Sequence, residues 1–240
     1  MSSAELLALW EQGLGQPTVR RALLLWSAFT GQPIRELAQL SVGQRDAQLL
    51  ELRARIFGPQ LTSLATCPAC GERLELRINI HELRARTTSE CGPIQVLQHE
   101  EYEATFRLPT SLDLAELRAD WDAAVNRNRL IELCVVSARR GETEVPVSQL
   151  PQATLGAIAQ RMAEADPYAD IQFTTTCPQC RHQWSALLDI ASFLWREIET
   201  LAQRLLSEVH LLAATYGWSE TEILALSPAR RQCYLSLIPR

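Results

Sequence analysis

The chain has 240 residues, enough for one large domain or two small ones with a sizeable buried core. Hydrophobic residues make up 47% and charged residues 21%, the usual balance of a soluble globular protein. The net charge is −5, and all 23 basic residues are arginine. This acidic balance argues against a general nucleic-acid binder, which usually carries a basic surface.

No apolar run approaches the ~18 residues that a membrane span requires, so we expect no membrane partner. The N-terminus lacks a basic segment, and Glu5 and Glu11 interrupt its apolar residues, which is unlike a signal peptide. We therefore expect a cytoplasmic protein. A reducing compartment favours metal binding over disulfides for closely spaced cysteines.

The first 60 residues predict three helices. Ser3 is expected to cap the first, which ends at the Gly/Pro-containing stretch 13–17. The second spans about 18–29. The third spans about 42–57 and stops at Gly58-Pro59.

The middle of the chain predicts strands and helices in alternation. Residues 74–78 alternate apolar and charged side chains, as in a half-buried strand. Further strands are expected near 94–97, 102–108, 171–174 and 182–187. Helices are expected near 113–118, where Ser111 is the cap, and near 121–136 and 151–165.

The C-terminal region predicts the clearest helix, with apolar residues at helical spacing and an end at Gly217. The stripe consists of Ile190, Leu194, Ile198, Leu201, Leu205, Val209, Leu212 and Tyr216. Ser219, with Glu222 three residues later, predicts a capped short helix. A last helix is expected from Pro228 to Ile238.

Two Cys-Pro-x-Cys turns predict a metal centre. Cys67 and Cys70 form the first pair, and Cys177 and Cys180 form the second. Each turn supplies two thiolates to one side of a tetrahedron, and two turns complete the four-sulfur shell that structural zinc prefers. We therefore expect one structural Zn²⁺ on these four cysteines.

The two pairs are far apart in the sequence, with 106 residues between Cys70 and Cys177. Ordinary zinc ribbons have about 15–20. The simplest explanation is a ribbon with an inserted subdomain, in an α+β fold that is mainly α-helical. The expected regions are N-terminal helices over 1–60, the first ribbon half over 61–81, an inserted α/β subdomain over 82–169, the second ribbon half over 170–189, and C-terminal helices over 190–240.

Other interpretations of the cysteines remain open. Each pair could be a redox dithiol, although neither lies at a strand-to-helix junction of a thioredoxin-like unit. Iron takes the same ligands, and two metals could be shared across a dimer. His182 is a possible substitute ligand, but an ordinary strand histidine is favoured because four cysteines fill the shell. Cys91, Cys134 and Cys233 have no partner at ligand spacing and are expected to act as small hydrophobic residues.

No catalytic motif is found, and a shell of four cysteines leaves zinc no open position. The sequence therefore predicts a non-enzymatic protein without a small-molecule substrate. Large aromatic residues beside arginine are common at interfaces. Trp218, Arg230, Arg231 and Tyr234 are therefore candidate partner-binding residues, with packing of the C-terminal helices as the alternative.

Several segments together resemble a known family. They are an aromatic-Gly-Trp motif and an Arg-Arg-x-x-Tyr-Leu motif within 216–235, Phe57-Gly58-Pro59, Phe106-Arg107-Leu108-Pro109, and Asp166-Pro167 ahead of the second cysteine pair. Their order along the chain resembles the T-even-type baseplate hub assembly family of contractile phage tails and phage-derived contractile injection systems.

The resemblance implies an assembly chaperone or minor component of a baseplate or hub, with baseplate or hub proteins as partners. It implies a location in the host cytoplasm during assembly, or in the finished virion or injection particle. Two other hypotheses come from the cysteines: a zinc-ribbon nucleic-acid-binding or transcription-related protein, and a zinc-dependent hydrolase. The first needs a basic ribbon surface, yet Glu72 and Glu75 flank the first turn beside Arg73 and Arg77.

Overall fold

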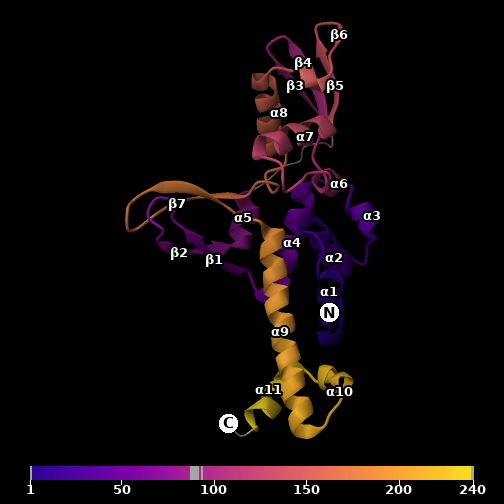
Figure 1. Ribbon diagram of the computed structural model, residues 1–240, viewed down its shortest axis with the longest axis vertical. Coiled ribbons are helices and arrows are strands. Elements are labelled where there is room, and N and C mark those ends of the chain that lie inside the picture. The colour runs from indigo at the N-terminus through magenta and orange to yellow at the C-terminus, as the bar shows by residue number, and fades with distance from the viewer. Residues whose placement is uncertain (1, 87–91, 93, 239–240) are drawn as a thin grey trace. The chain divides into compact units, whose positions relative to one another are not determined.

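A computed structural model describes residues 2–86, 92 and 94–238 (Figure 1). It is a mixture of helices and strands in which helix accounts for more than half of the chain. The chain divides into two compact units, one made of Met1–Gly31 with Ala191–Arg240 and the other of Gln32–Ile190. Within the described residues, no helix combines the length and apolar character needed to cross a membrane.

The first unit is helical. Its helices are α1 (Ser3–Gly13), α2 (Thr18–Thr30), α9 (Ile190–Tyr216), α10 (Glu220–Ala225) and α11 (Pro228–Ser236). Helix α1 packs against α2 and α10. The cap of α1 is Ser2 and not Ser3, because Glu5 at the third helical position completes a capping box with Ser2.

Helix α9 follows the predicted apolar stripe. Ile190, Leu194, Ile198, Leu205 and Leu212 are all buried. The stripe recurs every three or four residues, so its side chains lie along one face of the helix. The predicted cap at Ser219 is confirmed, since the Ser219 hydroxyl accepts a hydrogen bond from the Glu222 amide.

The second unit holds the strands. Its helices are α3 (Ile34–Leu37), α4 (Val42–Phe57), α5 (Ile80–Arg86), α6 (Ser111–Ala115), α7 (Ala123–Cys134), the 3₁₀ turn η1 (Val147–Gln149) and α8 (Gln152–Ala165). Its strands are β1 (Gln60–Thr66), β2 (Arg73–Asn79), β3 (Ile94–His99), β4 (Tyr102–Arg107), β5 (Val135–Arg140), β6 (Thr143–Glu144), β7 (Gln172–Thr176) and β8 (Gln183–Leu187).

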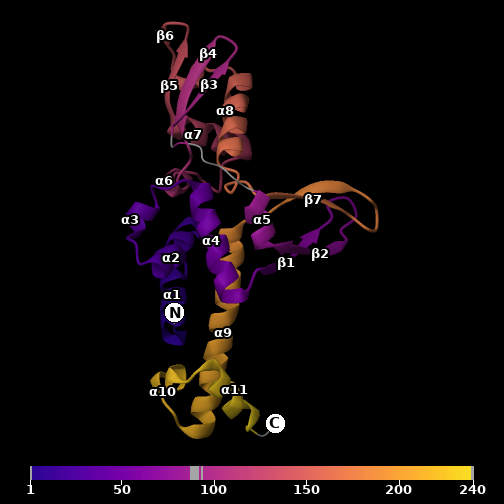
Figure 2. The same cartoon turned by 180° about the vertical axis from the view of Figure 1, so that it is seen from behind.

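Four of these strands form an antiparallel sheet in the order β3-β4-β5-β6, with α7 and α8 beside it (Figure 2). Phe106 and Ala138 of the sheet share a buried core with Ile131 of α7 and Ile158 of α8. The expected helix over 121–136 is too long, since α7 ends at Cys134 and β5 begins at Val135. Val135 is β-branched and pairs with Phe106, and this pairing overrides the helical pattern.

The N-terminus of α4 contacts the segment that carries this sheet at two points, just after β4 and just after α8. The Val42 amide donates to the Pro109 carbonyl at 2.9 Å, and the Gly43 amide donates to the Asp166 carboxylate at 2.8 Å. A β-carbon on Gly43 would lie 1.9 Å from an Asp166 oxygen, so only glycine permits this approach. A carboxylate is favourable at a helix N-terminus, where amides lack partners within the helix.

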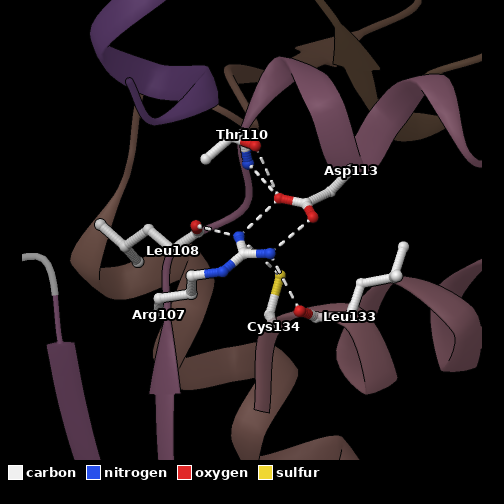
Figure 3. Close-up of polar contacts among 6 residues, drawn as sticks. All are labelled: Arg107, Leu108, Thr110, Asp113, Leu133 and Cys134. Atoms are coloured by element: carbon white, nitrogen blue, oxygen red, sulfur yellow. Dashed lines mark hydrogen bonds and ion pairs between the residues drawn. The ribbon is translucent and has the colours of Figure 1, made fainter. Parts of the chain in front are cut away.

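A second polar junction joins β4, α6 and α7 (Figure 3). Arg107 forms a bidentate ion pair with Asp113, at 2.6 and 2.7 Å, and donates to the Leu133 carbonyl at 2.9 Å. The Thr110 amide and hydroxyl also donate to Asp113, both at 2.8 Å. Thr110, and not Ser111, is therefore the cap of α6, because Asp113 lies three residues after it.

The Asp113 junction predicts a pH-dependent stability. Burial opposes ionisation of Asp113, but the hydrogen bonds from Arg107 and Thr110 outweigh it and lower the pKa of the carboxyl group. We expect Asp113→Asn to reduce the free energy of unfolding by about 2 kcal/mol at pH 7, since bonds between charged groups are lost. A carboxyl group with a lowered folded pKa stabilises the fold above its unfolded pKa, and this contribution is lost as pH falls through the folded value.

The difference in the free energy of unfolding between wild type and Asp113→Asn should therefore become smaller below about pH 4. Urea unfolding at several pH values measures it. Asp120→Asn is the matched control, because Asp120 pairs with Arg118 on the exposed surface and should contribute nothing measurable. Two results would contradict a stabilising role for the Asp113 carboxylate. One is an equal loss of unfolding free energy in Asp113→Asn and Asp120→Asn, and the other is a difference between wild type and Asp113→Asn that does not change with pH.

Candidate metal centre

The structure brings the two Cys-Pro-x-Cys turns together. The Sγ atoms of Cys67, Cys70, Cys177 and Cys180 all lie within 4.8 Å of one another. The sulfur–sulfur distance is 3.6 Å for Cys67 and Cys180, and also for Cys70 and Cys177. Both of these approaches run between the two turns, so each turn contributes to one shared cluster.

The backbone of the two turns is the same. The Cys67 amide donates to the Glu72 carbonyl at 2.8 Å, and the Cys177 amide donates to the His182 carbonyl at 2.9 Å. The amide of the residue after the second cysteine donates to the carbonyl of the first cysteine at 2.9 Å in both turns, from Gly71 to Cys67 and from Arg181 to Cys177. Both residues have a positive φ, 77° for Gly71 and 60° for Arg181. Positive φ suits glycine, so Arg181 adopts an uncommon conformation to repeat the turn.

Two antiparallel hairpins carry the turns, β1 with β2 and β7 with β8 (Figure 1). Their side chains alternate between exposed and partly or fully buried positions. On β1 and β2 the paired Leu61 and Ile78 are buried at the end away from the cysteines. A two-stranded hairpin is marginally stable alone, so each depends on contacts at its base and its tip.

The cluster fits a tetrahedral metal ion. A metal ~2.3 Å from four sulfurs sets sulfur–sulfur distances of about 3.8 Å, close to the 3.6 Å of the two inter-turn pairs. Cys67 and Cys177 are buried, whereas Cys70 and Cys180 are exposed. A bound metal would therefore lie near the surface with two sulfurs on its inner side.

The thiols do not ionise equally. Burial opposes ionisation of Cys67, but the amides of Cys70 and Ala69 outweigh it and lower the pKa of Cys67 to about 7. The backbone at Glu72 favours the Cys70 thiolate, but the neighbouring thiols, Cys180 first, raise the pKa of Cys70 to about 12. Four crowded thiols thus resist full ionisation, and a divalent cation would offset the repulsion between the thiolates.

The remaining sequence candidates lie elsewhere. His182 is exposed just before β8, stacks on Trp184 with ring centroids 6.2 Å apart, and is not in the four-cysteine cluster. Cys134 is fully buried in the sheet core, where burial raises its pKa to about 12, which confirms its prediction as a core residue. Cys233 is exposed on α11, and Cys91 lies outside the described residues.

All four candidate partner-binding residues, Trp218, Arg230, Arg231 and Tyr234, lie in the C-terminal part of the first unit. Tyr216, Trp218 and Tyr234 stack into an aromatic cluster, with centroids 4.7 to 5.7 Å apart. Trp218 and Tyr234 are each half-buried, and Arg230 is exposed beside them in the sequence. Trp218 and Tyr234 therefore pack the C-terminal helices, as the alternative predicted, and each keeps part of its surface exposed.

Arg231 is different, because it is only 2% exposed. Its guanidinium donates to the Glu208 carboxylate at 3.0 Å and to the Leu226 carbonyl at 2.7 Å. Gln232 donates to the same carboxylate at 2.7 Å. Arg231 thus holds α11 against α9. Glu208 was not among the predicted site residues, although a charged residue on the apolar stripe between Leu205 and Leu212 is a signal for a buried ion pair.

The fold and the cluster define a mixed helical and stranded protein in which four sulfurs from two distant turns form a potential metal site. A family model described as T4 bacteriophage base plate protein matches residues 25–195, well over half of the chain and including both cysteine pairs. The chain belongs to this T4-type phage baseplate family. No curated protein and no solved structure matches it.

The cluster predicts that metal content depends on all four cysteines together. Cys177→Ser should lose stoichiometric metal and unfold at a lower temperature, because a structural metal contributes its binding energy to folding. Elemental analysis with thermal unfolding measures both. Cys233→Ser, outside the cluster, is the control and should keep its metal. Full metal retention in Cys177→Ser would rule out a shared four-sulfur site.

In the wild-type chain, the affinity for the metal should rise with pH, since each cysteine ligand must lose a proton to bind.

The Arg231 contacts predict a local loss of stability. Arg231→Ala removes the buried cation of Glu208 and leaves only the largely exposed Arg204 paired with it, which should cost about 2 kcal/mol of protection for α11 because charged hydrogen bonds are lost. Hydrogen exchange of the α11 amides measures this opening free energy. Arg230→Ala is the matched control, because Arg230 is the adjacent and exposed residue. Equal protection in the two variants would show that the buried ion pair does not hold α11.

Proposed function

We propose that this chain is a non-enzymatic assembly factor, or a minor component, of a contractile-tail baseplate or hub. The observation that carries the proposal is the family match over residues 25–195. This region contains all four clustered cysteines, so the potential metal site lies within the part of the chain that is shared with the family. The same proposal extends to baseplates of phage-derived contractile injection systems.

We propose further that the metal is one structural Zn²⁺ and that the two hairpins form a zinc ribbon. Residues 61–81 would supply its first half and 170–189 its second, with 82–169 as an inserted subdomain between helices over 1–60 and 190–240. The support is the repeated backbone of the two turns and the fit of four sulfurs to a tetrahedron. Zinc prefers such sulfur shells in structural sites.

A structural role follows from the ligand set. Four cysteine sulfurs complete the coordination of a tetrahedral ion, so no position is left for a reactive water or a substrate. In that case the metal would link the two hairpins and set their geometry. The proposed activity is therefore protein–protein contact on a metal-stabilised scaffold, with baseplate or hub proteins as partners.

For the contact surface we propose the C-terminal segment with Trp218, Arg230, Arg231 and Tyr234. Trp218, Arg230 and Tyr234 each have accessible surface. Arg231 would act indirectly, because its bonds to Glu208 and Leu226 fix the helix that carries Arg230 and Tyr234. The contacts would form in the host cytoplasm during assembly, and would persist in the particle if the chain remains there.

Affinity purification tests the proposed function. A tagged chain, expressed together with the tail gene cluster of its own genome, should recover baseplate or hub proteins. An Arg230→Glu variant should recover less of them while it remains folded and metal-loaded. Glu142→Arg, a charge change in the exposed turn between β5 and β6, is the control and should recover as much as wild type. If the wild-type chain recovers no tail protein, the proposal is wrong.

A further inference from the structure

The two edges of the four-stranded sheet differ in a way that bears on association. At one edge β6 has only two residues, Thr143 and Glu144, and Glu144 is ion-paired with Arg139. A short, charged strand is a usual protection against unwanted pairing. At the other edge β3 has six residues, 94–99, of sequence Ile-Gln-Val-Leu-Gln-His. It carries no acidic residue, no arginine and no proline, and the bulge of this sheet lies between β4 and β5.

The backbone of β3 has free hydrogen-bonding capacity. Among the described residues, β3 pairs only with β4. The loop between these strands has two residues, so its closing pair His99 and Tyr102 exchanges both hydrogen bonds. Bonded and unbonded pairs alternate from there, so the amide and carbonyl groups of Ile94, Val96 and Gln98 point away from β4.

The same three residues also place their side chains on the open face of the sheet. Ile94 is 51% exposed and Val96 is 58% exposed, and Gln98 is exposed as well. The alternate residues, Gln95 and Leu97, face the buried side, where α8 packs against β3. An added strand would thus gain main-chain hydrogen bonds and also apolar neighbours at Ile94 and Val96.

We propose that β3 pairs with β3 of a second copy of this chain, antiparallel across a two-fold axis, to join the two sheets. An axis perpendicular to the sheet keeps both faces continuous if Val96 lies opposite Val96 and Ile94 lies opposite Gln98. In this register the outward-pointing backbone groups of each strand meet those of the other. Self-complementary contacts of this kind are what two-fold dimers use.

Charge favours this arrangement over the parallel one. The β3–β4 turn carries Glu100 and Glu101, with Glu103 nearby on β4, and among the described residues only Glu101 of the two turn residues is ion-paired, with Arg140 of β5 at 2.7 Å. Antiparallel pairing places the acidic turns of the two copies at opposite ends of the joined sheet. Parallel pairing would place them side by side, where like charges repel. Because β3 has no acidic residue and no arginine, pairing it with β3 of a second copy places no two like charges opposite one another.

The test is the mass of the metal-loaded chain in solution, measured by light scattering over a concentration series. Wild type should reach twice the monomer mass of 27.0 kDa at micromolar concentrations. Val96→Glu and Val96→Lys should each halve that mass, because the two-fold axis places two like charges opposite one another. An equimolar mixture of the two variants should recover the dimer, since Glu then faces Lys.

Val136→Glu is the matched control. Val136 is 63% exposed but lies on β5, which pairs with β4 and not with β3, so the same change leaves the β3 edge intact and should leave the dimer intact. A monomeric wild type, a dimeric Val96→Glu, or a mixture that does not recover would overturn the proposal. Dissociation by Val136→Glu would instead show that the sheet face forms the contact. The assay contains no tail protein, so its result is independent of the baseplate proposal.

Discussion

Four sulfur atoms from two places in the chain bring the two hairpins of the second unit together. Cys67 approaches Cys180 and Cys70 approaches Cys177, and both pairs bridge more than a hundred residues. The two hairpins that present them are two-stranded, and strands of that kind need further contacts to persist. A metal on these sulfurs would close a long loop that local contacts cannot close.

Closing the loop at the cysteines would not by itself place the segment between them. That placement comes from the N-terminus of α4, whose amides bond to Pro109 and to the Asp166 carboxylate on either side of α7, β5 and α8. The Arg107–Asp113 pair then ties β4 to α6 and α7. The N-terminus of α4 and the Arg107–Asp113 pair thus hold the chain just after β4 and just after α8, while the apolar core of the segment supports the sheet.

The use of charged groups in internal contacts determines which groups are left for partners. Glu208 uses its carboxylate on Arg204, Arg231 and Gln232, and Asp113 uses its carboxylate on Arg107 and Thr110. Some aromatic and apolar surface remains accessible, in part at Trp218 and Tyr234 in the first unit and more fully at Ile94 and Val96 in the second. A protein that works by association needs such surfaces, and membership of a baseplate family is consistent with them.

The sequence by itself determined the elements with strong periodicity or capping, such as α9 and the helix after Ser219, and it identified all four clustered cysteines. These features are local, because a helix repeat or a Cys-Pro-x-Cys turn is written in neighbouring residues. It did not determine that Val135 and Val136 leave the predicted helix and that residues 135–140 form β5, or that Arg231 is buried on Glu208. Both depend on groups distant in the chain, a strand partner at Phe106 and a carboxylate on α9, and only the tertiary structure brings those groups together.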